Sequence, residues 1–327
     1  MQRLMRDSTK TEPERAVQRE FRRNWLISAV ILVFAVLLFR AELNRLPNRT
    51  EVGQRTVPLL FQPVTLEPGS GDNFHLVGAW RLLADDRRFG GFSALASTEA
   101  GFIGLTDSGV VARFPRPNRN GSNVTLRELP NGPGAAGFKV NRDSEALVAD
   151  LRGRGWWVAF ENRNEVWLYD QAFTTAIKRV PVNGRGLMRN RGIEGMISTD
   201  QGIVLFPERG GKAFPFGGTG KITIDGVSGW VSDAASLPDG RLALINRQPT
   251  PIGLRNRLVI LARRGSAYSP QQSWTIPVGR LDNVEGLAVE LMPGRGTRIW
   301  LVTDNGLQQR RPTLLIAVEI RRRPARR

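Results

Sequence analysis

Acidic side chains recur at fixed places in a pattern that the chain repeats five times. Each copy has an apolar segment, a turn rich in Gly, Asp or Asn, and a second apolar segment that ends in a polar cluster. Aligned on Ser93, Glu145, Glu194, Ala235 and Glu285, the copies are 52, 49, 41 and 50 residues apart. A lone Glu therefore stands inside an apolar run in three of the five copies, and Ser93 and Ala235 replace it in the other two.

A second set of polar residues ends the second apolar segment of each copy. Its members are Asp107, Glu161, Glu208, Asn246 and Asp304. Arginines follow closely in three copies, within the words ENR, PER and INR; they are Arg163, Arg209 and Arg247. Crowded carboxylates raise one another's pKa unless a cation or an arginine neutralises them. We therefore expect the two acidic sets to matter chemically only if the fold brings them together.

The elements that would position these acids are β-hairpins. Turns such as DQG at 200–202 and PDG at 238–240 separate the two apolar segments of a copy. Third strands are predicted at 165–170, 257–263 and 313–320, and fourth strands at 123–129, 174–182, 221–225 and 272–278. Four antiparallel strands in a period near 50 residues, with no helical pattern after residue 45, predict an all-β fold, the β-propeller.

The number of blades follows from the strands that remain at the two ends. Residues 77–91 precede the first copy as a fourth strand would, and the last copy has only three strands of its own. An N-terminal strand that completes the C-terminal blade would remove the open sheet edges. This arrangement gives five four-stranded blades, and the leftover residues 56–66 leave a degenerate sixth blade open.

In a propeller the first strand of each blade lines the central channel and the second runs antiparallel to it. Both acidic sets are then expected at one channel mouth. A divalent cation such as Ca²⁺ takes oxygen ligands, and the mouth offers little else. The predicted metal ligands are Asp107, Glu145, Glu161, Glu194, Glu208, Glu285 and Asp304. Two alternatives stay open: the arginines pair with the acids, or individual acids accept backbone N–H groups of a neighbouring blade and hold its register.

The N-terminal part predicts a membrane anchor. Residues 25–39 contain no charge and are flanked by arginines, which indicates a short transmembrane span or a signal core. We expect a basic cytoplasmic region at 1–24, an anchor or uncleaved signal at 25–40, a linker at 41–56, the propeller at 57–320 and a basic tail at 321–327. The basic residues before the span predict a cytoplasmic N-terminus and an exported propeller.

Composition excludes several classes of site. The chain has no cysteine, so disulfides, thiolate metal sites and a cysteine nucleophile are excluded. His75 is the single histidine, which removes multi-histidine zinc sites and most histidine-based triads. The net charge is +17, but the basic residues form no stripe interleaved with aromatics, so no nucleic-acid partner is expected.

Several words of the sequence resemble the phytase-like, or esterase-like-activity-of-phytase, family of bacterial exported proteins. They are FGGFSALA at 89–96, LTDSG at 105–109, DSEALV at 143–148, FENR at 160–163, IEGM at 193–196, SDAASLPDGRL at 232–242 and VEGLAVE at 284–290. Together they span roughly residues 75–320. The resemblance implies a β-propeller that hydrolyses phosphate or other esters with a divalent metal.

These observations lead to two expectations about function. The first is a single-pass protein of the bacterial inner membrane whose periplasmic propeller hydrolyses phosphate esters with Ca²⁺ or another divalent cation. Glu145, Glu194 and Glu285 would be its catalytic residues, and three arginines would bind the small anionic ester: Arg163, Arg209 and Arg247. The second is a non-catalytic propeller that binds a protein, glycan or lipid partner in the cell envelope.

Overall fold

The computed structural model describes residues 12–43, 53–69, 71, 73–117, 122–182, 187, 192–292, 296–308 and 311–320. The chain divides into two compact units, Met1–Pro47 and Asn48–Arg327. Most of the predicted linker, the start of the basic N-terminal region and the basic tail lie outside the described residues.

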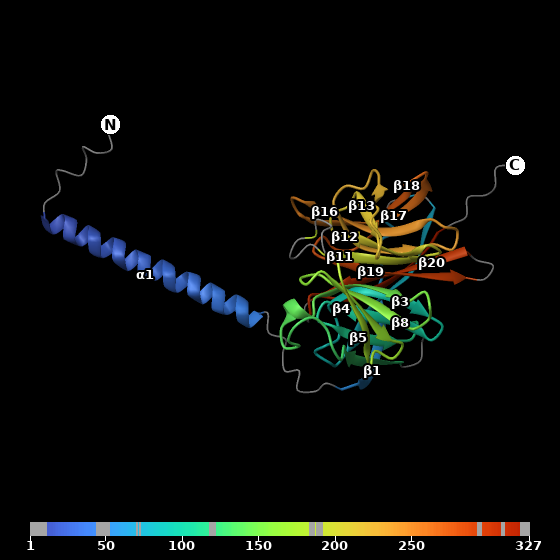
Figure 1. Ribbon diagram of the computed structural model, residues 1–327, viewed down its shortest axis with the longest axis horizontal. Helices are drawn as coiled ribbons and strands as arrows, with labels where there is room; N and C mark the ends of the chain where they lie inside the picture. Colours follow the sequence, from blue (N-terminus) through green and yellow to red (C-terminus); the bar gives the residue numbers. More distant parts are fainter. Residues whose placement is uncertain are drawn as a thin grey trace. The chain divides into compact units, whose positions relative to one another are not determined.

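The first unit contains one helix, α1 (Glu12–Leu43), in the part of it that the structure describes (Figure 1). It includes the uncharged run at 25–39, whose Leu and Ala residues favour helix. Its large apolar side chains between Phe21 and Leu37 are exposed. Among the described residues, no helical stretch combines the length and the apolar character that a membrane crossing requires.

The described strands of the second unit lie in three hydrogen-bonded sheets of nine, four and eight strands. Except for β1, they divide into five groups of four antiparallel strands. Group 1 comprises β3 (Phe92–Thr98), β4 (Gly101–Thr106), β5 (Val110–Phe114) and β6 (Ser122–Glu128). Group 2 comprises β7 (Ser144–Ala149), β8 (Gly155–Phe160), β9 (Glu165–Asp170) and β10 (Ala176–Pro181). Group 3 comprises β11 (Ile193–Thr199), β12 (Gly202–Pro207), β13 (Lys212–Pro215) and β14 (Ile222–Ile224). Group 4 comprises β15 (Trp230–Ser236), β16 (Leu242–Thr250), β17 (Gly253–Arg264) and β18 (Ala267–Thr275). Group 5 comprises β19 (Asn283–Met292), β20 (Gly296–Asp304), β21 (Thr313–Ile320) and the N-terminal β2 (Phe74–Ala84).

The first strands of the groups contact one another in a closed order. β3 contacts β7, β7 contacts β11, β11 contacts β15, β15 contacts β19, and β19 returns to β3. Sheets whose inner strands form such a ring are typical of a β-propeller, so the prediction of an all-β propeller is confirmed. A 3₁₀ turn, η1 (Lys139–Asn141), lies between the first two groups.

The two ends of the second unit meet in group 5, as the sequence predicts. β2 pairs antiparallel with β21, with Trp80 opposite Leu315, so an N-terminal strand completes the last sheet. The leftover segment is β1 (Arg55–Pro63), which pairs with β2 on one side and with β6 on the other. It thus links the outer strands of groups 5 and 1 and begins no further four-stranded group among the described residues.

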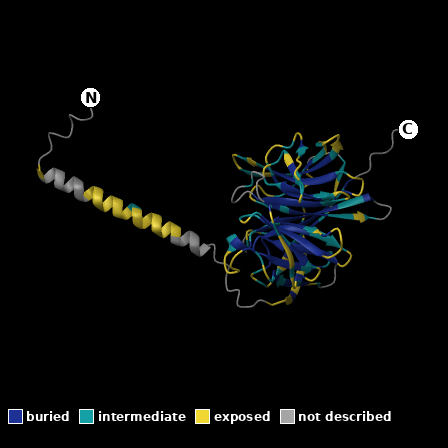
Figure 2. Ribbon diagram, viewed as in Figure 1, coloured by how far each residue is buried: buried dark blue, intermediate teal, exposed yellow. Residues whose placement is uncertain are grey.

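The core lies between the faces of neighbouring sheets, which explains the continuous apolar runs in the second strands. All residues of β4 and of β8 are buried, on both faces of each strand. One core cluster joins Leu105 of group 1 to Val158 and Phe160 of group 2. Because each sheet is covered on both sides, most of its buried residues are apolar. Figure 2 shows the buried residues concentrated inside the second unit.

Each first strand contains an irregularity of one extra residue at the same place. The register shifts between residues 92 and 94, 144 and 146, 193 and 195, 231 and 233, and 284 and 286. A β-bulge re-aims the side chain of its extra residue. The extra residues are Ser93, Glu145, Glu194, Ser232 and Glu285. The bulge accounts for a lone acid inside each of three apolar strands.

The bulges correct the sequence alignment of the fourth copy. Ser232, rather than Ala235, occupies the position of the recurrent Glu. The alignment was wrong by three residues because the word SDAAS offers no acid at the bulge and two alanines after it. Its Asp233 follows the bulge, where Gly195 and Gly286 stand in groups 3 and 5.

Those two glycines let neighbouring first strands approach closely. A Cβ on Gly195 would lie 2.8 Å from the backbone nitrogen of Ala234, and one on Gly286 would lie 2.9 Å from the carbonyl carbon of Ala94. Both contacts are with the backbone of the next strand in the ring. The close packing of groups 3 and 5 against the next first strand therefore favours glycine at these two positions.

Candidate functional site

The acidic residues converge because each first strand begins where its second strand ends. Ser144 pairs with Phe160, Ile193 with Pro207, and Asn283 with Asp304. The acidic cluster consists of Asp107, Asp143, Glu145, Glu161, Glu194, Glu208, Glu285 and Asp304. The structure thus brings together all seven acids predicted as metal ligands and adds Asp143, the residue before the start of β7.

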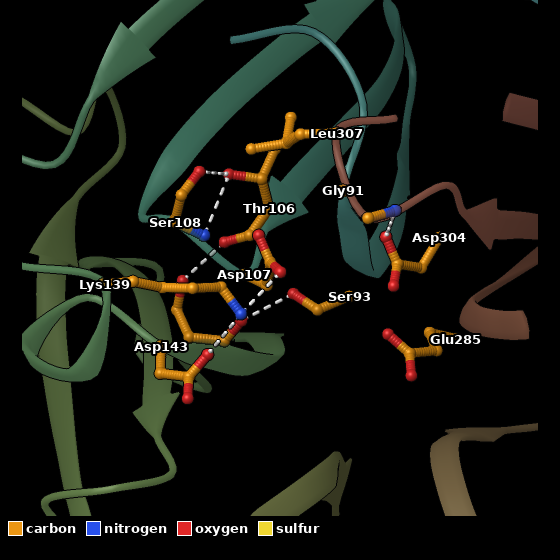
Figure 3. A network of polar contacts seen from close by, with 12 residues as sticks. Gly91, Ser93, Thr106, Asp107, Ser108, Lys139, Asp143, Glu285, Asp304 and Leu307 are labelled. Carbon is orange, nitrogen blue, oxygen red and sulfur yellow. Dashed lines mark hydrogen bonds and ion pairs between the residues drawn. The ribbon is translucent and has the colours of Figure 1, made fainter. Parts of the chain in front are cut away.

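Lys139 neutralises one side of the acidic cluster. Its Nζ lies 2.7 Å from Asp107 Oδ2 and 3.2 Å from Asp143 Oδ1, so it ties group 1 to group 2 (Figure 3). Burial raises the pKa of Asp107 to about 6, against the opposing charge of Lys139. Asp107 Oδ1 is buried and has no hydrogen-bond partner among the described residues. Lys139 belongs to η1, outside the repeated words, and the sequence analysis missed it.

Arg247 neutralises the opposite side. Its Nη1 donates to Glu285 Oε1 at 2.7 Å and to Asn283 Oδ1 at 2.6 Å, and its Nη2 lies 3.6 Å from Glu208 Oε1. The guanidinium also lies over the Trp230 ring, 5.4 Å from its centroid. Burial raises the pKa of Glu285 to about 8, and the charge of Asp304 adds to that effect while Arg247 opposes it.

Three acids of the cluster form no ion pair with a described residue; they are Glu145, Glu161 and Glu194. Carboxylate oxygens of Asp143, Glu145 and Glu161 lie within 4.8 Å of one another. Burial raises the pKa of Glu161 to about 7, helped by the charge of Asp143 and by a hydrogen bond between the two carboxyl groups. The pKa of Glu145 is raised by burial and next by the charge of Glu194.

Glu194 is the most buried acid of the cluster among the described residues. Only 6% of the residue is exposed, and no described residue donates a hydrogen bond to its carboxylate. Its pKa lies well above the ordinary range because of burial first and then the charges of Glu161, Glu285 and Glu208. A buried carboxylate without a partner is costly, so a proton or a bound cation must compensate it. An all-oxygen donor set around it fits a hard divalent cation.

Among the described residues, the other predicted polar residues form no hydrogen bond or ion pair with the acids of the cluster; they are Arg163, Arg209 and Asn246. Arg163 is exposed and donates from Nε to Asn141 Oδ1 at 3.0 Å, and Arg209 is exposed. Both follow the end of their strand, whereas Arg247 is still within β16 and opposite Trp230. Asn246 is buried, and its amide donates to the Ser228 carbonyl at 2.8 Å. Only Arg247 of the three predicted arginines contacts the cluster in the described structure.

An acid that the repeat alignment did not single out holds the register between blades. Asp233 is 3% exposed and accepts the N–H groups of Ala234 and Leu287, both at 2.7 Å. Leu287 belongs to the first strand of the next group. Ser93 acts similarly, donating to the Ser144 carbonyl of the next group at 2.5 Å. The register-holding role thus applies to Asp233 and Ser93, while Glu145 and Glu194 have no such bond to described residues.

The ring of antiparallel sheets with polar residues at one end defines the chain as a β-propeller. Residues 87–215 match the family described as phytase-like, esterase-like activity of phytase, so the predicted resemblance is confirmed over these residues. A search among curated proteins found no match.

Comparison with solved structures found similar chains at low sequence identity. Glutaminyl cyclase of Myxococcus xanthus is 13% identical with a TM-score of 0.50, and the match covers 78% of this chain and 99% of that one. The Pan2 WD40 domain of Neurospora crassa is 12% identical with a TM-score of 0.36, over 72% and 90% of the two chains. The Cps50 (Swd1) β-propeller domain of Myceliophteria thermophila is 12% identical with a TM-score of 0.34, over 73% and 70%.

Proposed function

We propose that the chain is a divalent-cation-dependent ester hydrolase, acting on phosphate esters at the acidic cluster. The observation that carries the proposal is Glu194: a carboxylate in a residue 6% exposed, without a hydrogen-bond donor among described residues, beside other acids. The family match over residues 87–215 supports the esterase class.

The cation would be held by the acids that neither Lys139 nor Arg247 compensates fully. These ligands are Asp143, Glu145, Glu161 and Glu194. A hard cation such as Ca²⁺ supplies charge neutralisation and polarises a phosphoryl or carbonyl oxygen. A surplus of carboxylates repels an anionic ester, so we propose that substrate binds only when this surplus is compensated.

Without a cation, burial and the charge of Asp143 raise the pKa of Glu161 to about 7. As a proposed ligand, Glu161 would give up this proton when the cation binds. Glu285 is already held by Arg247 and Asn283, which suits it to positioning Arg247 rather than to proton transfer. Arg163 has guanidinium N–H groups beyond those bonded to Asn141, and it is the exposed arginine that we propose meets the substrate phosphate.

We also propose that the five groups are the complete set of blades and that residues 25–39 anchor the chain in a bacterial inner membrane. The closed order of the first strands supports the blade count. The uncharged run and its basic flank support the anchor, with a periplasmic propeller. Alkaline carbonate extraction of membranes tests the anchor: the chain is expected in the pellet, and recovery in the supernatant would refute it.

The activity is tested on the full-length chain purified in a mild detergent. Ca²⁺, Mg²⁺ or Mn²⁺ is added, and hydrolysis of p-nitrophenyl phosphate, bis(p-nitrophenyl) phosphate, phytate and acyl esters is measured. We expect turnover that chelation abolishes and that Glu194→Gln reduces strongly. Glu99→Gln is the matched control, because Glu99 is exposed in the turn between β3 and β4. Equal rates for the two variants, or no turnover with any cation, would refute the proposal.

A further inference from the structure

A cavity lies outside the acidic cluster, between the outer part of group 1 and a turn of group 2. Its volume is about 370 Å³, and its lining includes Gln54, Arg113, Thr125, Arg127 and Gln171. Arg113 is on β5 and Arg127 on β6, the third and fourth strands of group 1. The cavity is large enough for a small ligand and belongs to the periphery of the sheet, away from the first strands.

The strand register puts the two arginines on one face of the sheet. Arg113 pairs with Thr125, and Val111 pairs with Arg127, so the arginines are diagonal neighbours across β5 and β6. Burial lowers the pKa of Arg113, and the charge of Arg127 lowers it further. The two positive charges are thus held close together on a partly buried face of the sheet.

Neutral groups, rather than acids, hold both guanidinium groups in place. Arg113 donates to the Gln171 carbonyl and lies over the Phe173 ring at 5.5 Å, and Arg127 donates to Gln54 Oε1 at 2.7 Å. Neither forms an ion pair with a described residue. The nearby Asp170 is occupied by Thr174 and Thr175, whose backbone N–H groups donate to its Oδ1 at 2.6 and 2.8 Å.

We propose that this cavity binds a small phosphate-bearing molecule, with Arg113 and Arg127 as a two-guanidinium clamp for its oxyanion. Each guanidinium has five N–H donors, and the bonds to Gln171 and Gln54 leave most of them available. The planar forks suit a tetrahedral oxyanion. The lining described here contains no carboxylate to act as a base, so the site binds its ligand without hydrolysing it. It is thus distinct from the acidic cluster.

The experiment uses the full-length chain in detergent with EDTA present, so that the acidic cluster holds no cation. Isothermal titration calorimetry is performed with inorganic phosphate and with phenylphosphonate, which has no ester bond to hydrolyse. The double variant Arg113→Gln/Arg127→Gln is expected to weaken binding roughly tenfold or more, since two charge-assisted contacts are lost. Arg263→Gln/Arg264→Gln, at the exposed end of β17, makes the same charge change and is expected to bind as the parent does.

A second variant fills the cavity without changing charge. Ala172 also lines the cavity and is exposed, so Ala172→Trp is expected to weaken phenylphosphonate binding while thermal unfolding stays unchanged. No saturable binding by the parent chain, or equal weakening by both arginine pairs, would overturn the proposal. Because EDTA is present throughout, either result is independent of the hydrolytic activity proposed for the acidic cluster.

Discussion

We expect Glu194→Gln to be more stable than the parent chain without a divalent cation, and less stable than the parent when the cation is present. Without a cation, the variant removes a buried charge that Glu161, Glu208 and Glu285 repel and that Arg247 alone attracts among its main partners. Two unit charges about 4 Å apart interact by about 4 kcal/mol at an effective dielectric constant near 20. Partial protonation relieves much of this repulsion, so we expect the variant to be more stable than the parent by about 1–3 kcal/mol at pH 8.

With the cation present, the parent chain gains stability from cation binding, and Glu194→Gln gains little. A ligand that binds only the folded state at 100 times its Kd stabilises that state by about 2.7 kcal/mol. The amide introduced by Glu194→Gln would offer one neutral oxygen in place of a charged carboxylate, so the variant is expected to gain little.

The assay is urea unfolding of both proteins in EDTA and in excess Ca²⁺, with Glu99→Gln as the matched control. Glu99 is exposed at the other end of its hairpin, and its neutralisation is expected to leave both transitions within about 0.5 kcal/mol of the parent. If Ca²⁺ stabilises Glu194→Gln as much as the parent, Glu194 binds no cation. If Glu194→Gln is less stable than the parent in EDTA, a group already present in the cluster compensates the charge of the Glu194 carboxylate.

Three further predictions concern pH and packing. In EDTA, the free energy of unfolding should fall as the pH rises from about 4.5 to 8. The reason is that Glu161 and Glu285 lose their protons near pH 4.5 in the unfolded chain, whereas their pKa values in the folded chain are about 7 and about 8. A rise in the urea midpoint over this pH range would contradict the prediction. Asp233→Ala should cost about 2–5 kcal/mol of unfolding free energy, because it leaves the N–H groups of Ala234 and Leu287 without their acceptor; a loss under 1 kcal/mol would show that the bonds do not hold the blades together. Gly286→Ala should lower the thermal midpoint, since its Cβ would lie 2.9 Å from the Ala94 carbonyl carbon, whereas Gly137→Ala, with no atom within 4 Å, should not; equal midpoints would refute the packing argument.

The period of the sequence predicted the fold well because the signal is local and repeated. The third strands expected at 165–170 and 313–320 have the bounds of β9 and β21, and the N-terminal strand completes the last group as expected. Hairpin patterns depend on alternation and turn residues within a dozen positions, which a single sequence displays.

The site was only partly predictable because some of its residues act through tertiary contacts. The recurrent acids mark the bulges, but Lys139 occurs once, in the turn η1, and no repeated word points to it. The bulge at Ser232 was missed because no Glu marks it in the fourth copy. Arg163 and Arg247 end the similar segments ENR and INR, but only Arg247 lies within its strand. Which of the two contacts the cluster therefore depends on where each strand ends.

The measurement that tests the central claim most directly is metal analysis of the purified full-length chain after equilibrium dialysis against Ca²⁺. We predict a stoichiometric divalent ion in the parent chain and in Glu99→Gln, and its loss in Glu194→Gln. A parent chain that retains no ion, or a Glu194→Gln variant that retains as much as the parent, would contradict the claim that the acidic cluster is a cation site.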